Sequence, residues 1–433
     1  MNARNLTLFA LVACLYLGTG FLQSWNLSLS ILNAALLGTI AALGVNMQWG
    51  YAGLFSVGTM GFTALGGLAV VLVSARPNAE NWQAGGLGIL LALVLGALAV
   101  MAAIFAWRRL PKGRLRALGV AAIMVGGFFL FRAVLDPSVT AAEAINPQFA
   151  GNIGGLGLPS LVAWPVGGLL AAAAAWGIGK TALGLRSDYL AIATLGIAEI
   201  TVSVMKNEDW LARGVKNIID LPRPWPVPYE VDLQQNAVYL DTVSRWGLDP
   251  VTTSTIGVKL LYAGMFGLVL AMVIFAFERA LHSPWGRMMR AIRDNEVSAA
   301  AMGKDVTGRH LQVFVLGSAV IGFAGAMMTS MDGQLTPGTY TPLRFTFLVW
   351  VMVIVGGSGN NWGTVLGGLL IGWLWLVVEN IGPNIMHLIT APFPDSALKA
   401  HLLGSAEHMR LLTMGVILLL VMRFSPRGLI PEK

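Results

Sequence analysis

Few residues of this chain could carry chemistry inside an apolar environment, and the first is Glu199. It lies about ten residues into the apolar stretch YLAIATLGIAEITVSV, and a stretch of this kind is long enough to enter a bilayer as a helix. A carboxylate at mid-depth is costly unless it meets a partner group or water. Two interpretations remain open. Glu199 lines a solute path or pairs helices beside one, or it is a hydrogen-bonded acid that fixes helix packing.

The motifs that would indicate catalysis are incomplete or absent in this sequence. Gly179-Lys180-Thr181 looks like the end of a phosphate-binding loop, but Ala174 stands where that loop requires its first glycine. The sequence has no HExxH, no GxSxG and no His/Cys cluster with metal-ligand spacing. Cys14 is the only cysteine, which excludes an intramolecular disulfide and a cysteine metal site. We therefore expect this chain to be no enzyme, with no catalytic residue, no metal and no cofactor.

One long polar segment, residues 282–310 (HSPWGRMMRAIRDNEVSAAAMGKDVTGRH), separates two apolar runs. Arg287, Arg290 and Arg293 recur at helical spacing, and Gly303 follows as a stop signal. The pattern predicts a short amphipathic helix that ends at this glycine. A membrane protein with a structured amphipathic helix in a polar loop is expected to offer it to a soluble partner. A merely solvated basic loop is the alternative.

Composition identifies the class of protein that must position these groups. Hydrophobic residues make up 56% of the 433 residues, charged residues only 11%, and the mean hydropathy is +0.71. Soluble domains carry about twice that share of charge. About twelve apolar segments recur along the chain, many of them long enough to span hydrocarbon. They are residues 6–22, 27–46, 52–73, 85–107, 115–135, 161–179, 189–205, 258–277, 311–331, 345–357, 365–378 and 411–422. We predict an all-α polytopic transmembrane protein in which some short segments are half-helices or re-entrant pieces.

The distribution of basic residues predicts the orientation. The net charge of +7 reflects Lys and Arg gathered in a few loops, so no nucleic-acid partner is expected. If the N-terminus is cytoplasmic, the basic residues of 108–116, of 282–310 and of the C-terminal tail all fall on the cytoplasmic side. We therefore predict a multi-pass protein of the cell inner membrane, surrounded by lipid, with both termini cytoplasmic.

The chain is predicted to form a single transmembrane domain over residues 1–433. Residues 206–257 would be an external insertion, which is either a docking surface or a plain structured loop. Two glycine-rich segments, GYAGLFSVGTMGFTALGG and GGSGNNWGTVLGG, lie one in each half of the chain and weakly suggest paired repeats. Glycine permits close helix packing, and glycine with polar residues also permits broken helices that line a cavity. The candidates for a translocation path are Ser56, Thr59, Glu199, Ser358 and Asn360.

Several stretches resemble the permease subunits of ABC importers for branched-chain amino acids, the LivM-like group. They are residues 50–62, 183–200, 283–306, 314–327 and 353–368, which together cover about a third of the chain. The stretch SPWGRMMRAIRDNEVSAAAMGKDV is the most specific. The resemblance implies the fold of an ABC importer permease with inverted repeats.

The resemblance also implies a role for the 282–310 loop. It would hold a coupling helix that docks in a groove of an ATP-binding subunit, with an EAA-like element from Glu296 to Gly303. The residues implied in coupling are Arg287, Arg290, Arg293, Glu296, Ala299, Ala300 and Gly303. The implied partners are a second permease subunit, two cytosolic ATP-binding subunits and an external or periplasmic solute-binding protein.

The sequence departs from the family pattern at residues 54–59 and 212–216. The substrate therefore stays open between branched-chain amino acids, urea or short amides, and related small polar solutes. An ion-coupled secondary carrier is the rival from another class, although only one deep acid supports it. An intramembrane enzyme is disfavoured by the missing catalytic motifs.

Overall fold

The computed structural model describes residues 3–145, 152–185, 187–392, 396–405 and 408–432. Within these ranges the regular structure is helical, and the only β-type pairing is an isolated bridge between Ile218 and Leu335. By length and composition, nine helices of the described residues could cross a membrane, or ten if a bent pair is one span. The prediction of an all-α polytopic membrane protein is confirmed.

The long helices account for most of the predicted apolar segments. They are α1 (Ala3–Leu22), α2 (Trp25–Val45), α5 (Leu87–Arg109), α6 (Arg114–Glu143), α7 (Ser160–Ala182), α8 (Ser187–Asn207), α12 (Pro250–His282), α15 (Val306–Asp332) and α17 (Asn361–Thr390). Single π-helical turns extend α2 (η1, Asn46–Gly50) and lead into α5 (η2, Trp82–Gly86) from the short α4 (Ala79–Asn81).

The remaining predicted segments form shorter helices. These are α3 (Thr59–Ser74), η5 with α16 (Leu343–Phe347 and Leu348–Gly356), and α19 (Met409–Phe424), whereas α18 (Ala397–Gly404) lies outside the predicted segments. Each predicted segment is thus helical, but α3 and α16 are too short for complete helical spans. Helix α3 overlaps the first glycine-rich segment, and α16 ends at Gly356, where the second one begins.

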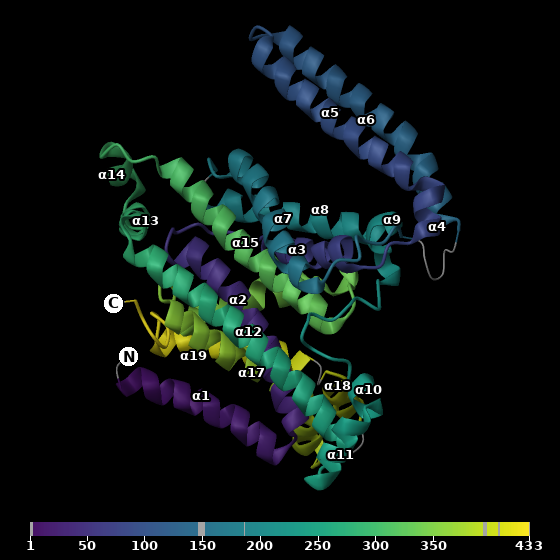
Figure 1. Cartoon of the computed structure of the whole chain (residues 1–433). Helices are drawn as coiled ribbons and strands as arrows, with labels where there is room; N and C mark the ends of the chain where they lie inside the picture. Colours follow the sequence, from purple (N-terminus) through teal and green to yellow (C-terminus); the bar gives the residue numbers. More distant parts are fainter. Residues whose placement is uncertain (1–2, 146–151, 186, 393–395, 406–407, 433) are drawn as a thin grey trace.

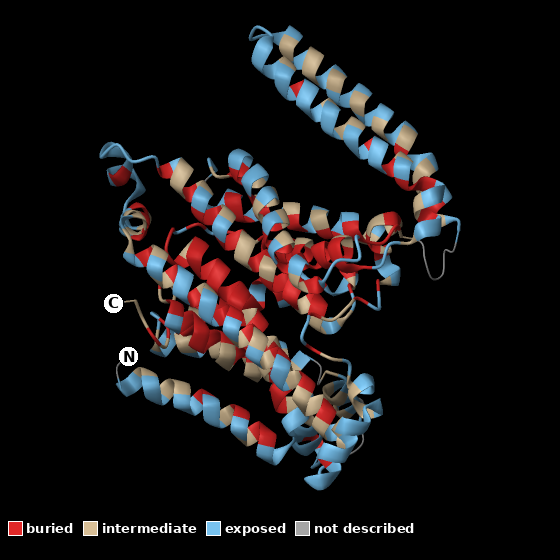
Figure 2. Cartoon of the chain, in the orientation of Figure 1, coloured by how far each residue is buried: buried red, intermediate tan, exposed pale blue. Residues whose placement is uncertain are grey.

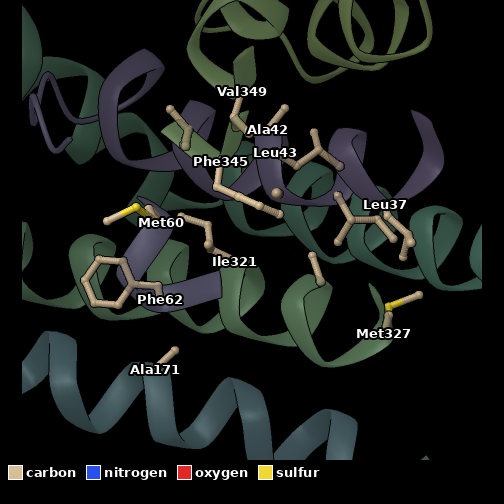
Figure 3. Close-up of a cluster of buried hydrophobic side chains, with 14 of the residues drawn as sticks. Leu37, Ala42, Leu43, Met60, Phe62, Ala171, Ile321, Met327, Phe345 and Val349 are labelled. Atoms are coloured by element: carbon tan, nitrogen blue, oxygen red, sulfur yellow. The ribbon is translucent and has the colours of Figure 1, made fainter. Parts of the chain in front are cut away.

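The core is built around α2, which is buried on most of its surface (Figure 2). Its sequence, SLSILNAALLGTIAALGV, is apolar or small on every face, as expected of a helix surrounded by other helices. It packs against α12, α15, α16 and α17. Figure 3 shows Leu37 and Leu43 of this helix in one cluster with Phe345 and Val349 and with Ile321 and Met327 of α15.

Glycines set the closest helix approach, where α3, α7 and α15 meet. A Cβ added at Gly66 would collide with the backbone of Gly322, and one at Gly322 would collide with Ala171 and Gly167. A Cβ at Gly167 would lie 2.9 Å from Ala326 Cβ and 3.1 Å from Gly66 Cα. Small residues supply helix packing in lipid, where no hydrophobic drive between helices exists. The predicted packing role is confirmed for Gly66.

The second glycine-rich segment follows the prediction only in part. Gly363 and Gly367 of α17 lie against Gly356 at the end of α16, so these glycines permit close helix packing. Gly359 takes no part in a helix. It lies in the turn before α17 with φ +77°, because Asn360 caps the helix that starts after it.

Helices α5 and α6 form a hairpin that packs mainly on itself and projects from the rest of the molecule (Figure 1). Its side chains are mostly exposed (Figure 2). The hairpin is held at its base by a small apolar cluster in which Ile89, Ala92 and Leu135 pack with Ile153 and Trp210. Its exposed apolar surface suits contact with lipid.

The loops gather at two ends of the bundle (Figure 1). One end carries the start of α1, the C-terminal tail and the short helices α13 (Pro284–Asp294) and α14 (Glu296–Ala301). The opposite end carries α9 (Asp209–Ala212), η3 (Gly214–Lys216), α10 (Glu230–Gln235), α11 (Ala237–Arg245) and η4 (Pro337–Thr339). Because α8 and α12 are longer than expected, the predicted 206–257 insertion is reduced to the chain between Asn207 and Pro250.

Candidate functional site

The predicted amphipathic segment after α12 consists of two helices, so the prediction of a single helix across residues 287–303 is wrong. The helix breaks at Asn295, which has extended dihedral angles (φ −157°, ψ 97°). Its side chain accepts a hydrogen bond from Ser298 N at 2.9 Å and thereby caps α14. Asparagine is favoured at this position because its short side chain satisfies a free N–H of the first turn. Gly303 follows α14 with φ +74°, as expected of a stop signal.

Helix α13 is amphipathic and lies with its apolar face inward. Met289 and Ile292 are fully buried, whereas Arg287 is exposed on the other side. Arg290 is half-buried, and its Nη2 donates to the carbonyl of Leu281 at 3.4 Å. The apolar face fixes α13 against the bundle, so α13 is a rigid connection between α12 and the outer tip.

Arg293 has a role that its position in the sequence does not reveal. Its Nη1 donates to Glu432 Oε2 at 2.8 Å and to the carbonyl of Gly50, and its Nε donates to Asp294 at 3.2 Å. Burial alone would lower the pKa of Arg293, but the carboxylates of Glu432 and Asp294 outweigh it and the net shift is upward. The guanidinium therefore joins three parts of the chain inside the protein instead of facing a partner.

The C-terminal strap, residues 429–432, completes this junction. Leu429 N donates to Val355 O and Ile430 N to Gly356 O, both at 2.9 Å, and Asn360 Nδ2 donates to Pro431 O at 3.2 Å. The strap thus runs along the end of α16 and brings Glu432 to α13. No spacing in the sequence marks this pairing, since its partners are far apart along the chain.

Helix α14 forms the exposed tip of the loop. Ala299 is buried, but Glu296, Ala300 and Gly303 are exposed, and so are the apolar side chains of Val297 (80%) and Met302 (78%). These two strongly exposed apolar side chains lie at the start of α14 and just past its end, so the tip presents apolar surface to its surroundings. The residues implied in coupling are therefore divided: Arg290, Arg293 and Ala299 contact the protein, and the others are exposed at the surface.

We expect Arg293→Gln to weaken the attachment of α13 without unfolding the bundle, because it removes a charge-assisted bond that is only half-buried. Glu432→Gln should have the same, smaller effect. Hydrogen–deuterium exchange of residues 284–301 should rise several-fold in both variants. Arg287→Gln is the matched control on the same helix, since Arg287 is exposed. Equal exchange in Arg293→Gln and Arg287→Gln would contradict this role.

Ser56 lies in an extended stretch between η1 and α3, inside the bundle. Non-helical backbone at membrane depth needs partners from the protein. Val57 N accordingly donates to Thr194 Oγ1 at 3.0 Å, Val57 O accepts from Thr346 Oγ1 at 3.3 Å, and Trp350 Nε1 donates to Ser56 O at 3.2 Å. The Ser56 hydroxyl itself is buried without a hydrogen-bond partner among the described residues. Side chains from α8, η5 and α16 thus hold a broken span in place.

The other path candidates lie in different surroundings. Thr59 is buried at the start of α3, and its carbonyl accepts from Thr63 Oγ1 at 2.9 Å. Asn360 caps α17, accepting from Trp362 N at 3.0 Å, and half-buried Ser358 precedes it in the turn beside the strap. Ser358 and Asn360 thus lie at the α13 end, where Asn360 has an evident structural role.

Glu199 is exposed on the surface of α8. The neighbouring Ala198 is buried against Gly61 of α3, so Glu199 points away from the bundle of this chain. Gly196 and Ser203 share the exposed face with it. Beside this helix, Phe55, Leu195 and Trp350 line an open apolar groove of about 490 Å³.

The described residues contain no group of three or more His, Cys, Asp or Glu side chains that could hold a metal ion. The fold and the site together define the class: a multi-pass helical membrane protein with a broken span in its core and a structured helical loop at one end. The family model described as "Branched-chain amino acid transport system / permease component" matches residues 112–422, most of the chain. The chain belongs to this permease family.

Curated relatives give the same family. The high-affinity branched-chain amino acid transport system permease protein LivM of Escherichia coli (strain K12) is 28% identical over 271 residues, which cover 62% of this chain and 56% of that protein. A probable branched-chain amino acid transport permease protein LivM of Methanocaldococcus jannaschii is 32% identical over 162 residues, 37% of this chain and 44% of the relative. The chain therefore spans about half the length of these relatives. No solved structure matches it.

Proposed function

We propose that this chain is a transmembrane permease subunit of an ATP-driven ABC importer for branched-chain amino acids or closely related small solutes. The observation that carries the proposal is the exposed tip α14, held on a rigid connection between two membrane-spanning helices. The names of the two relatives support branched-chain amino acids as the substrate, since both are named as permeases for them. In this function ATP hydrolysis belongs to two cytosolic partner subunits, and this chain is no enzyme.

The loop is suited to transmit motion. An ATP-binding subunit that accepts α14 in a groove would hold Val297 and Met302, both strongly exposed in this chain. Movement of that groove would reach α12 and α15 directly, because α13 and α14 connect them. Arg293 would carry the same movement to η1 and to the strap. Alternating access follows when these helices move together between two arrangements.

A second permease subunit is supported by the exposed face of α8. Glu199 lies near the middle of this 21-residue helix, at a depth where a carboxylate facing lipid is costly. In the proposed complex this face meets the second permease or a water-filled path between the two subunits, so Glu199 keeps its role as a path candidate. The adjoining groove at Phe55 and Trp350 would lie at the same interface.

The opposite end of the bundle is the proposed side of the external solute-binding protein. The chain between α8 and α12 forms a structured surface there, with the exposed aromatic side chains of Trp225 and Trp246. The positive-inside rule then places α13, α14 and both termini in the cytoplasm of a cell with this protein in its inner membrane. Lipid surrounds the outer helices, and no nucleic acid takes part.

Transport by the reconstituted complex tests this function. The chain is co-expressed with the products of its neighbouring genes, purified, and placed in proteoliposomes with the external binding protein. We expect uptake of radioactive leucine that requires ATP on the α14 side and needs no ion gradient. Uptake that persists without ATP and follows an imposed proton gradient would establish the secondary carrier instead. ATP-driven uptake of urea without leucine would establish the urea or amide permease.

A further inference from the structure

An apolar cavity of about 110 Å³ lies inside this chain between α2, α15, α16 and α17. Leu37, Leu348, Val349, Met352 and Trp375 line it. Figure 3 shows Leu37, Phe345 and Val349 from this part of the core. Cavities of about 150 Å³ lined by aliphatic side chains hold molecules as large as benzene. The space is therefore of the right order for a branched aliphatic side chain.

A second, polar chamber of about 240 Å³ adjoins the first. Its walls include Thr329, Gln334, Thr336 and Tyr340, from the end of α15 and the loop before η5. Burial raises the pKa of Tyr340 to about 12, so its hydroxyl keeps its proton and remains able to donate. Because its walls come from the end of α15 and the loop before η5, the polar chamber lies toward the end of the bundle that carries α9 to α11. The apolar cavity lies deeper.

Two opposite charges stand at the boundary of the chambers. Asp332, the last residue of α15, and Arg344 of η5 line both spaces. Among the described residues neither side chain has a hydrogen-bond or ion-pair partner, although Arg344 lies over the ring of Phe345 at 5.4 Å. Both side chains are exposed in this chain, so water solvates them and a ligand can reach them. A carboxylate and a guanidinium that share a cavity without bonding each other leave both open to a ligand.

We propose that this boundary is a binding site for the zwitterionic head of a free amino acid with an apolar side chain. Asp332 accepts from the ligand's ammonium group, Arg344 donates to its carboxylate, and the side chain enters the apolar cavity. The site deepens the proposed function, on which the choice of substrate rests. Its chemistry separates two of the open substrates, because urea and short amides carry no charge for either residue.

Binding to the full chain alone, in lipid nanodiscs and without ATPases, tests the site by calorimetry. The probes are L-leucine, leucinamide, which lacks the carboxylate, 4-methylpentanoate, which lacks the ammonium, and urea. Arg344→Gln should weaken L-leucine binding at least about tenfold but leave leucinamide within about threefold of its wild-type affinity. Asp332→Asn should weaken L-leucine similarly and spare 4-methylpentanoate. Retained binding of the matching analogue shows that each variant is folded.

The exposed pair of Asp241 and Arg245 on α11, at the same end of the bundle, supplies the controls. Asp241→Asn and Arg245→Gln should leave L-leucine binding unchanged. The site is refuted if L-leucine fails to bind, if both boundary variants bind it normally, if all probes weaken equally, or if urea competes with it. Because the binding assay contains no ATPase, its outcome does not depend on the outcome of the uptake experiment in proteoliposomes. Leucine binding without ATP-driven uptake would refute the proposed function and leave the site intact.

Discussion

Val297→Asp should abolish ATP-driven leucine uptake and reduce the ATPase that copurifies with the chain at least about tenfold. The Val297 side chain is 80% exposed on α14, so the substitution disturbs no packing within this chain. A groove that receives an apolar helix would have to bury the new carboxylate without a partner, which is strongly unfavourable. Ala300→Asp, on the same exposed helix, should act in the same direction.

Val238→Asp is the matched control. This valine is 76% exposed on α11, a short helix at the opposite end of the bundle. It should leave ATPase recovery unchanged, and all variants should insert at wild-type levels. Full uptake and full ATPase recovery in Val297→Asp and Ala300→Asp would remove α14 as the docking helix.

Gly167→Leu should prevent most of the chain from reaching its folded state. The glycine lies where α7 meets α3 and α15, with Gly66 Cα only 3.1 Å from the position of an added Cβ. A larger side chain cannot be accommodated by a rotamer change, because backbone blocks it, so the helices must separate and lose their contacts. The expected result is a severe loss of the monodisperse peak in size-exclusion chromatography.

Gly177→Leu is the control on the same helix. No atom lies within 4 Å of a Cβ added there, and the position is exposed. It should give the wild-type yield and unfolding temperature. If both glycine variants behaved alike, the close crossing of α3, α7 and α15 would not determine stability.

The sequence predicted the class of fold and the long apolar helices, but not the short helices α4, α9, α10, α11 and α18. Membrane-spanning helices satisfy their own backbone and need a long apolar run, so this signal is local and strong. The half-helices α3 and α16 could also be anticipated, because glycine and polar residues interrupt the apolar pattern there. The break at Asn295 was missed, since the helical spacing of the arginines outweighed the capping signal of a single asparagine.

The site was less predictable, because its groups depend on long-range contacts. Arg293 fits the arginine pattern of α13, yet it bonds to Gly50 and Glu432, which local spacing cannot indicate. Asp332 and Arg344 lie near helix ends, where charged residues are common and do not by themselves indicate a binding site. Only the fold places both on one cavity. Glu199 was recognised from depth alone, but depth does not reveal which way its helix faces.

The C-terminal strap has a consequence for the order of events during synthesis. Glu432 emerges from the ribosome 139 residues after Arg293, and by then the helices from α15 to α19 have already been made. The loop that holds α13 and α14 therefore gains this tie only at a late stage of biogenesis. A nascent chain that lacks the strap still has every described helix, yet it has no Glu432 to hold α13. Synthesis of the strap thus precedes full fixation of the surface proposed to meet the ATPase.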